Sequence, residues 1–139
     1  MIKALILSAA FASEASALQE AIYFESRGEP KACQYYVAGV VKNRMLSDKF
    51  PDTIQGVVEQ PYQFSYKARA DLAMHNIKAR DYAYNVAHSV LTSSNEPVFE
   101  NILYFHTKDV DPHWNDAMME VVRCGGHIFY TEYPDITLD

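Results

Sequence analysis

Apolar residues recur every three or four positions in three long stretches of the chain, Ser13–Arg27, Lys31–Leu46 and Lys78–Leu91. This spacing is typical of helices that bury one face. The sequence therefore predicts three long helices within the first two thirds of the chain.

Local signals predict where the helices begin and end. Ser13 is a natural N-cap for the first helix, and Gly28 can supply the left-handed residue that ends it. We expect a further short helix at 53–59. Asp52 is expected to cap it, with Gln55 three residues later, as in a capping box.

The last third of the chain has a different pattern. "NILYFH" (101–106) has the composition of a strand, and "MMEVVRCGGHIFY" (118–130) is typical of a hairpin whose turn lies at 124–126. Before this region, residues 60–71 form an aromatic-rich loop. Helices first and a small antiparallel sheet later predict an α+β fold.

Length and composition narrow the class of protein. A chain of 139 residues, 49% of them hydrophobic, is long enough for one domain with a single core. The net charge of −6 argues against nucleic acid as the main partner, because phosphate binding requires a basic face. No run of 18 apolar residues is present, so no transmembrane segment is expected. Cys33 and Cys124 fit no metal-ligand spacing, and they can form one disulfide or remain two buried thiols.

The first 17 residues allow two interpretations. "MIKALILSAAFASEASA" has a lysine, a short apolar run and small residues at candidate cleavage sites, as in a secretory signal. Alternatively the segment leads into the first helix, and cleavage after Ala17 would remove that helix's first turn. We favour the intact segment and expect residues 1–139 to form a single domain.

Two carboxylates flank the end of the first helix. Glu25 lies at the helix C-terminus, where the helix dipole disfavours negative charge, and its aromatic neighbours would desolvate it. Both effects raise the pKa of a carboxyl group. A carboxyl that stays protonated near neutral pH can act as a general acid on a glycosidic oxygen. An ion pair with Arg27 or Arg44 is the alternative, whereas Glu29 is expected to cap the second helix.

Four blocks of sequence follow, in order, the pattern of one known family. "AIYFESRGEP" (21–30) is similar to a YxEARGE signature, and "VAGVVKNRM" (37–45) is similar to VAxVVLNRV. "FPDTIQGVVEQPYQFSY" (50–66) is similar to FPxTVxGVVxQxxQFS, and "YFH" with "GGHIFY" (125–130) is similar to YFH and GxHxFY. Together the blocks cover about residues 18–130 and resemble the SleB-type cell wall hydrolases, the spore-cortex lytic enzymes and their phage and bacterial relatives.

This resemblance implies a compact lysozyme-like fold and an enzyme that cuts the glycan strands of peptidoglycan. Family members are generally lytic transglycosylases. One glutamate protonates the departing oxygen and then takes the proton of the muramoyl C6 hydroxyl, which closes a 1,6-anhydro ring. By position that glutamate is Glu25. Ser26 replaces the family's usual alanine, and the Glu-Ser pair is similar to that of the soluble lytic transglycosylases. No cofactor or metal is implied.

Other residues in or near these blocks are candidates for binding the sugar chain or supporting the site. Amide side chains can bind N-acetyl groups and aromatic faces can support sugar rings. The alternatives are structural: loop packing for Gln63, the core for Phe64 and Trp114, a satisfied half-buried ring for His106 and a hydrogen bond within the hairpin for His127. The substrate-binding candidates are Gln60, Gln63, Phe64, Tyr104, His106, Trp114, His127 and Tyr130. The structural candidates are Ser26, Gly28, Glu29, Asn43 and Arg44.

Three other functions stay open at this point. A hydrolytic muramidase needs a second carboxylate, and its candidates, Asp71, Asp109 and Asp111, lie outside the matching blocks. A metal-dependent peptidase or amidase is disfavoured because the histidine spacing fits no HExxH-like motif. An inactive wall-binding or virion module is disfavoured by Glu25. We expect peptidoglycan strands as partner, other virion or envelope proteins as carriers, and a phage virion or the cell envelope as location.

Overall fold

The computed structural model describes the backbone of residues 8–61 and 63–134 and the side chains from residue 10 onward. The helices are α1 (Ser8–Ser26), α2 (Lys31–Leu46), α3 (Ile54–Val58) and α4 (Ile77–Ser93). The strands are β1 (Tyr104–Thr107), β2 (Met118–Cys124) and β3 (His127–Glu132). Single 3-10 turns are η1 (Ser65–Ala68), η2 (Phe99–Asn101) and η3 (Asn115–Ala117). Helices followed by a small antiparallel sheet confirm the predicted α+β class.

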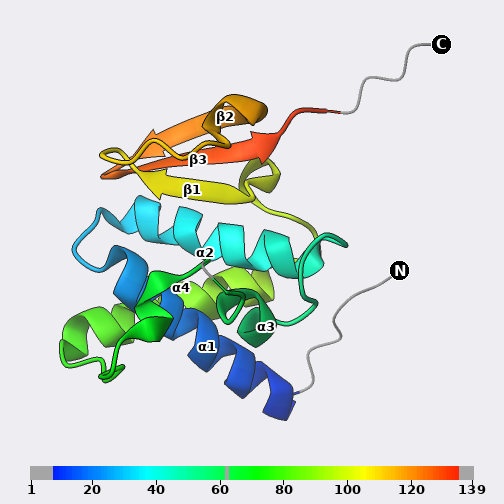
Figure 1. Cartoon of the computed structure of the whole chain (residues 1–139). Helices are drawn as coiled ribbons and strands as arrows, with labels where there is room; N and C mark the ends of the chain where they lie inside the picture. The colour runs from blue at the N-terminus through cyan, green and yellow to red at the C-terminus, as the bar shows by residue number, and fades with distance from the viewer. Residues whose placement is uncertain (1–7, 62, 135–139) are drawn as a thin grey trace.

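The elements form two layers. The sheet lies over one side of α2, and α1, α3 and α4 pack on the other side (Figure 1). The strand order is β1-β3-β2, with β3 antiparallel to both neighbours. In the β1–β3 register, Tyr104 lies opposite Tyr130 and Thr107 lies opposite His127. Among the described residues, no helix has the length and apolar character needed to cross a bilayer.

Helix α2 is central because both of its sides are buried. Val41 belongs to the core shared with the other helices, whereas Val40 packs beneath the sheet with Phe129. At Gly39 an added Cβ would lie 2.6 Å from the ring of Phe99, so only glycine allows this close approach.

Helix α1 extends further toward the N-terminus than the sequence predicts. It begins at Ser8, so Ser13 lies within the helix and is not its N-cap. Ala15 is fully buried in the core. The signal-like segment from residue 8 onward is therefore part of a helix that packs against the core. Residues 1–7 of that segment lie outside the described residues.

Two other element boundaries differ from the prediction. Asp52 does not cap α3, because Thr53 is the N-cap and its Oγ1 accepts a hydrogen bond from the Gly56 N–H at 2.9 Å. The strand predicted from residue 101 begins at Tyr104, since η2 interrupts the extended chain. All three η2 residues have positive φ, between 52° and 57°, which is costly for residues other than glycine.

The side chain of Asn43 holds this unusual turn in place. Its Nδ2 donates to the carbonyls of Val98 (2.8 Å) and Ile102 (2.9 Å), and its Oδ1 accepts from the Val98 N–H (2.7 Å). Asn43 is 1% exposed, so these bonds are made away from water. A buried network with every partner satisfied can stabilise a backbone that local preferences disfavour.

A disulfide and a hydrogen bond join the β2–β3 turn to the start of α2. Cys33 and Cys124 form a disulfide, which decides between the alternatives that the sequence leaves open. Beside it, the Glu29 carboxylate accepts a hydrogen bond from the Gly126 N–H, at 3.2 Å to the nearer oxygen. Glu29 therefore does not cap α2, whose N-cap is Pro30 without a side-chain hydrogen bond.

Candidate active site

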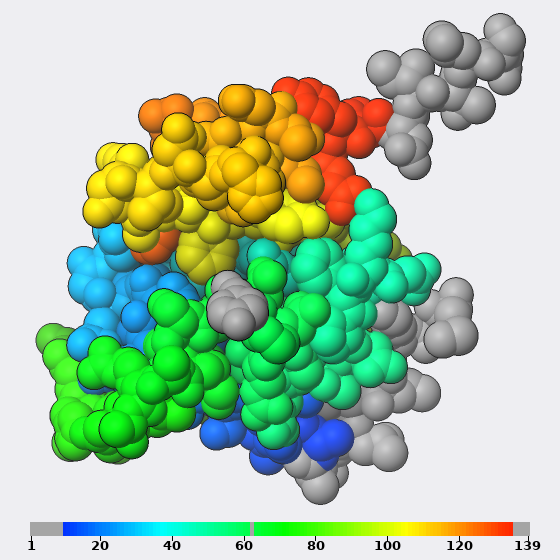
Figure 2. All heavy atoms as spheres, viewed as in Figure 1, coloured from blue at the N-terminus to red at the C-terminus, as the bar shows by residue number. Residues whose placement is uncertain are grey.

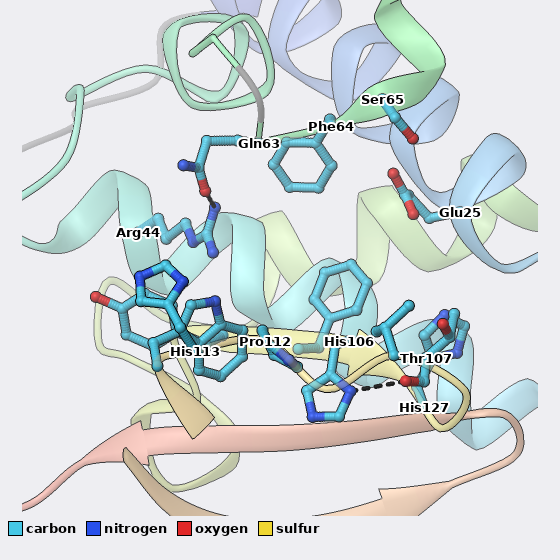
Figure 3. Close-up of a pocket in the computed structure, with 14 residues that line it drawn as sticks. Glu25, Arg44, Gln63, Phe64, Ser65, His106, Thr107, Pro112, His113 and His127 are labelled. Atoms are coloured by element: carbon cyan, nitrogen blue, oxygen red, sulfur yellow. Dashed lines mark hydrogen bonds between the residues drawn. The ribbon is translucent and has the colours of Figure 1, made fainter. Parts of the chain in front are cut away.

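A cleft of about 660 Å³ opens between the sheet layer and the helical layer. In Figure 2 the surface is hollowed between the yellow segment that includes β1 and the green segment that includes η1. The described residues that line the cleft are Glu25, Arg44, Gln63, Phe64, Ser65, Tyr104, Phe105, His106, Thr107, Val110, Pro112, His113, Trp114 and His127. Figure 3 shows Glu25 beside Ser65 at one end, Arg44 with Gln63 at the other, and Phe64 between them.

Glu25 comes from the last turn of α1, where Gly28 turns the chain away with a φ of +85°. Its carboxyl is half-buried, and burial raises its pKa from the ordinary value of 4.5 to about 7. Across residues 8–61 and 63–134, no hydrogen bond or ion pair engages this carboxylate. The alternative pairing with an arginine does not occur, because Arg27 stacks over Tyr23 at 4.6 Å and Arg44 binds elsewhere. Glu25 therefore has the protonation that a general acid requires near neutral pH.

Arg44 from α2 forms the opposite end of the cleft. It is 5% exposed, and its Nε donates to the Leu103 carbonyl at 2.7 Å. Its Nη1 donates to Gln63 Oε1 at 3.1 Å. Burial lowers the pKa of this guanidinium to about 10. Arg44 was predicted to be structural, yet it presents a cation to the cleft.

An aromatic cluster lies on the sheet side of the cleft. The Trp114 ring lies 5.2 Å from Tyr130, 5.4 Å from Tyr104 and 5.6 Å from His106. Tyr130 itself is buried and does not line the cleft, but its hydroxyl is hydrogen-bonded to His106 Nε2 at 2.7 Å. Tyr130 therefore fixes the His106 ring from behind, and Trp114 offers an apolar ring to a ligand.

His127 reaches the cleft from the start of β3. It is 3% exposed, its ring lies 5.4 Å from that of Phe105, and burial lowers its pKa. Its Nδ1 is 3.7 Å from Glu29 Oε1, too long for a hydrogen bond, and makes no hydrogen bond with any described residue. Because the Gly126 N–H holds the Glu29 carboxylate by a hydrogen bond, this carboxylate lies next to the Nδ1 side of the His127 ring.

The structure brings most of the predicted binding residues together. Those that line the cleft with Glu25 are Gln63, Phe64, Tyr104, His106, Trp114 and His127. Gln60 and Tyr130 do not line it. Ser26 is buried, and its Oγ donates to the Ile22 carbonyl at 2.8 Å.

Other lining residues were not among the predicted binding residues, although Ser65 belongs to the matching block at 50–66. Ser65 begins η1, Thr107 ends β1, and Val110, Pro112 and His113 lie in the loop after β1, where no periodicity marks a side chain as facing a cleft. Only the position of His113 next to the single tryptophan could have drawn attention to it.

The acidic residues considered as second carboxylates do not take part. Asp71, Asp109 and Asp111 are all exposed and do not line the cleft. Within the described ranges, no cluster of three or more His, Cys, Asp or Glu side chains could hold a metal ion. The chemistry of the cleft therefore centres on one carboxyl group.

A protein-family model described as Cell Wall Hydrolase matches residues 28–130. The chain belongs to this family, and the resemblance expected from its motifs is confirmed. The match begins just after Glu25, so the argument for this residue depends on its place in the cleft.

The relatives that the chain matches are lytic enzymes of bacterial spores. The spore cortex-lytic enzyme of Bacillus subtilis (strain 168) is 33% identical over 115 residues, which are 81% of this chain and 35% of the relative. That of Bacillus cereus (strain ATCC 14579) is 31% identical over 114 residues, which are 81% of this chain and 42% of the relative. The chain thus spans about 35–42% of the length of these curated relatives.

Two solved structures have the same fold. The catalytic domain of the germination-specific lytic transglycosylase SleB from Bacillus anthracis matches with a TM-score of 0.68 and 28% identity, covering 85% of this chain and 93% of that one. The catalytic domain of the Bacillus cereus SleB protein matches with a TM-score of 0.69 and 28% identity, covering 86% and 91%. These matches confirm the lysozyme-like α+β architecture expected from the resemblance.

Proposed function

We propose that this chain cleaves the glycan strands of peptidoglycan as a lytic transglycosylase, with Glu25 as its only acid and base. One observation carries the proposal. Glu25 is the only carboxylate among the described residues that line the cleft, and burial raises its pKa to about 7. The names of the relatives, spore cortex-lytic enzyme and lytic transglycosylase, point to the same reaction.

The proposed reaction needs two proton transfers. Protonated Glu25 donates its proton to the glycosidic oxygen while the bond between that oxygen and C1 of the muramoyl residue breaks. The carboxylate then accepts the proton of the C6 hydroxyl as the C6 oxygen attacks C1 and closes a 1,6-anhydro ring. Glu25 returns to its protonated state, so the cycle consumes no water. A pKa near the working pH suits a group that acts first as an acid and then as a base.

Among the described residues that line the cleft there is no second carboxylate, which favours this reaction over hydrolysis. An inverting hydrolase needs a partner carboxylate roughly 6.5–9.5 Å away to activate water, and a retaining one needs a nucleophile at about 5–5.5 Å. A transglycosylase takes its nucleophile from the substrate. The remaining lining residues fit a sugar chain, with Trp114 and Phe64 as ring contacts and Gln63, His106 and His127 as polar contacts.

The proposed setting is the cell envelope or a phage particle that acts on it. A disulfide such as Cys33–Cys124 persists in an oxidising compartment and not in the bacterial cytosol. The net charge of −6 provides no attraction to anionic wall polymers, so we propose that virion or envelope proteins deliver the chain to its substrate.

Digestion of purified peptidoglycan followed by mass spectrometry tests the proposal. We expect fragments that end in 1,6-anhydromuramic acid, and we expect Glu25→Gln to abolish their release because an amide cannot donate the proton. Glu96→Gln, on an exposed loop, is the matched control and should digest normally. Fragments with reducing ends would indicate a hydrolase, cut peptide bonds would exclude both glycosidases, and full activity of Glu25→Gln would remove Glu25 from the mechanism.

A further inference from the structure

The end of the cleft opposite Glu25 contains a buried positive charge that has no carboxylate partner among the described residues. Arg44 is 5% exposed, yet none of the ion pairs formed among the described residues includes it. Buried charges in proteins are almost always paired, because removing an ion from water is costly. A buried arginine that faces a cleft and has no acidic partner is therefore a candidate for binding an anion from outside the protein.

The hydrogen bonds of Arg44 leave one edge of its guanidinium unused. Nε and Nη1 are engaged by the Leu103 carbonyl and by Gln63 Oε1. Nη2 makes no hydrogen bond with the described residues, and Arg44 is among the residues that line the cleft. The amide of Gln63 lies beside it with its own N–H donors, away from Glu25 (Figure 3).

Aromatic rings surround the guanidinium where acids would be expected. The ring centroids nearest to its central carbon belong to Phe50 (5.0 Å), Tyr104 (5.4 Å) and Phe64 (5.7 Å). Contacts of this kind stabilise a cation without neutralising it. They also exclude water, which strengthens the attraction between the guanidinium and an incoming anion.

We infer that Arg44 and Gln63 form a subsite for a free carboxylate on the peptide stem of the glycan strand. The inference rests on the proposed function and adds a determinant of specificity to the same cleft. The N-acetylated sugars of the glycan chain are uncharged, whereas the peptide stems attached to them carry free carboxylates. A guanidinium binds a carboxylate more strongly than a neutral carbonyl, because both the charge and the planar fork match. The subsite therefore favours strands whose stems keep their acids over strands whose stems are amidated.

The test uses binding without turnover. In a Glu25→Gln background, isothermal titration compares a disaccharide–peptide fragment that has free stem carboxylates with the same fragment after amidation of those carboxylates. We expect the free form to bind about 10- to 100-fold more tightly, the range for a hydrogen bond to a charged group. Adding Arg44→Gln should remove this preference, and adding Arg80→Gln, on α4, is the matched control and should retain it.

The preference measured in the Glu25→Gln chain decides the inference even if Arg44→Gln folds poorly. Equal affinity for the two fragments overturns the subsite and leaves glycan binding intact. Failure to bind either fragment overturns both the subsite and the proposed function. Arg44→Lys is a second variant that keeps the charge but not the planar fork. It should keep only part of the preference, and full retention would contradict the geometric argument.

Discussion

Replacing Glu25 with glutamine should stabilise the folded protein at alkaline pH and leave its stability at acid pH unchanged. The reason is that the cleft buries this carboxyl, whereas unfolding exposes it to water. Glutamine has a similar shape and is neutral at every pH. The comparison of the two proteins therefore isolates the free-energy cost of the charge.

The size of the effect follows from the pKa. Burial raises the pKa of Glu25 from 4.5 to about 7. At roughly 1.4 kcal/mol per pKa unit, the ionised carboxylate destabilises the fold by about 3 kcal/mol. Below pH 4.5 the group is neutral in both states and there is no penalty. The penalty grows as the pH rises from 4.5 to about 7 and is complete above that, because the folded state holds the proton more tightly.

Urea unfolding of both proteins at several pH values, with the disulfide kept oxidised, measures this difference. We expect the free energies of unfolding to agree at about pH 4 and to differ by about 3 kcal/mol in favour of Glu25→Gln at about pH 8. Glu96→Gln should follow the parent protein throughout. A difference that does not change with pH, or a less stable Glu25→Gln at pH 8, would refute the claim that the cleft desolvates Glu25.

Three further predictions concern activity and stability. The kcat/KM for glycan cleavage should be constant below about pH 7 and fall about tenfold per pH unit above it, because the first step needs protonated Glu25; a profile flat to pH 9 would contradict this. Asn43→Ala should lower the free energy of unfolding by about 3 kcal/mol in chemical denaturation, because it leaves the partners of three hydrogen bonds unpaired. The control Asn95→Ala, at an exposed position, should change this free energy little. Replacing both Cys33 and Cys124 with serine should lower the free energy of unfolding by about 2–5 kcal/mol in the same assay, because the disulfide joins residues 91 positions apart. An unchanged denaturant midpoint would show that the disulfide does not constrain the unfolded chain.

Some features of this protein are determined by the sequence over short distances. Helix α2 spans the predicted residues 31–46, and Gly28 has the left-handed φ predicted for it. The hairpin turn at 125–126 lies within the predicted segment. Glu25 is also recognisable from its position, because its location at a helix end is set by its neighbours. Helical periodicity, glycine turns and the helix dipole all act within a few residues, so a single sequence shows them directly.

Other features exist only once distant segments meet. Nothing near Glu29 in the chain indicates that it binds Gly126, 97 residues away. Likewise, Arg44 looks like a structural residue at the end of a helix, and it becomes part of a cleft only when Gln63 and the β1 strand lie beside it. Tyr130 belongs to a matching motif, but the register of β3 places it behind His106 and out of the cleft. The sequence determined which residues could do chemistry, and packing decided which of them share a cleft, because burial and pairing depend on contacts between segments that local pattern cannot specify.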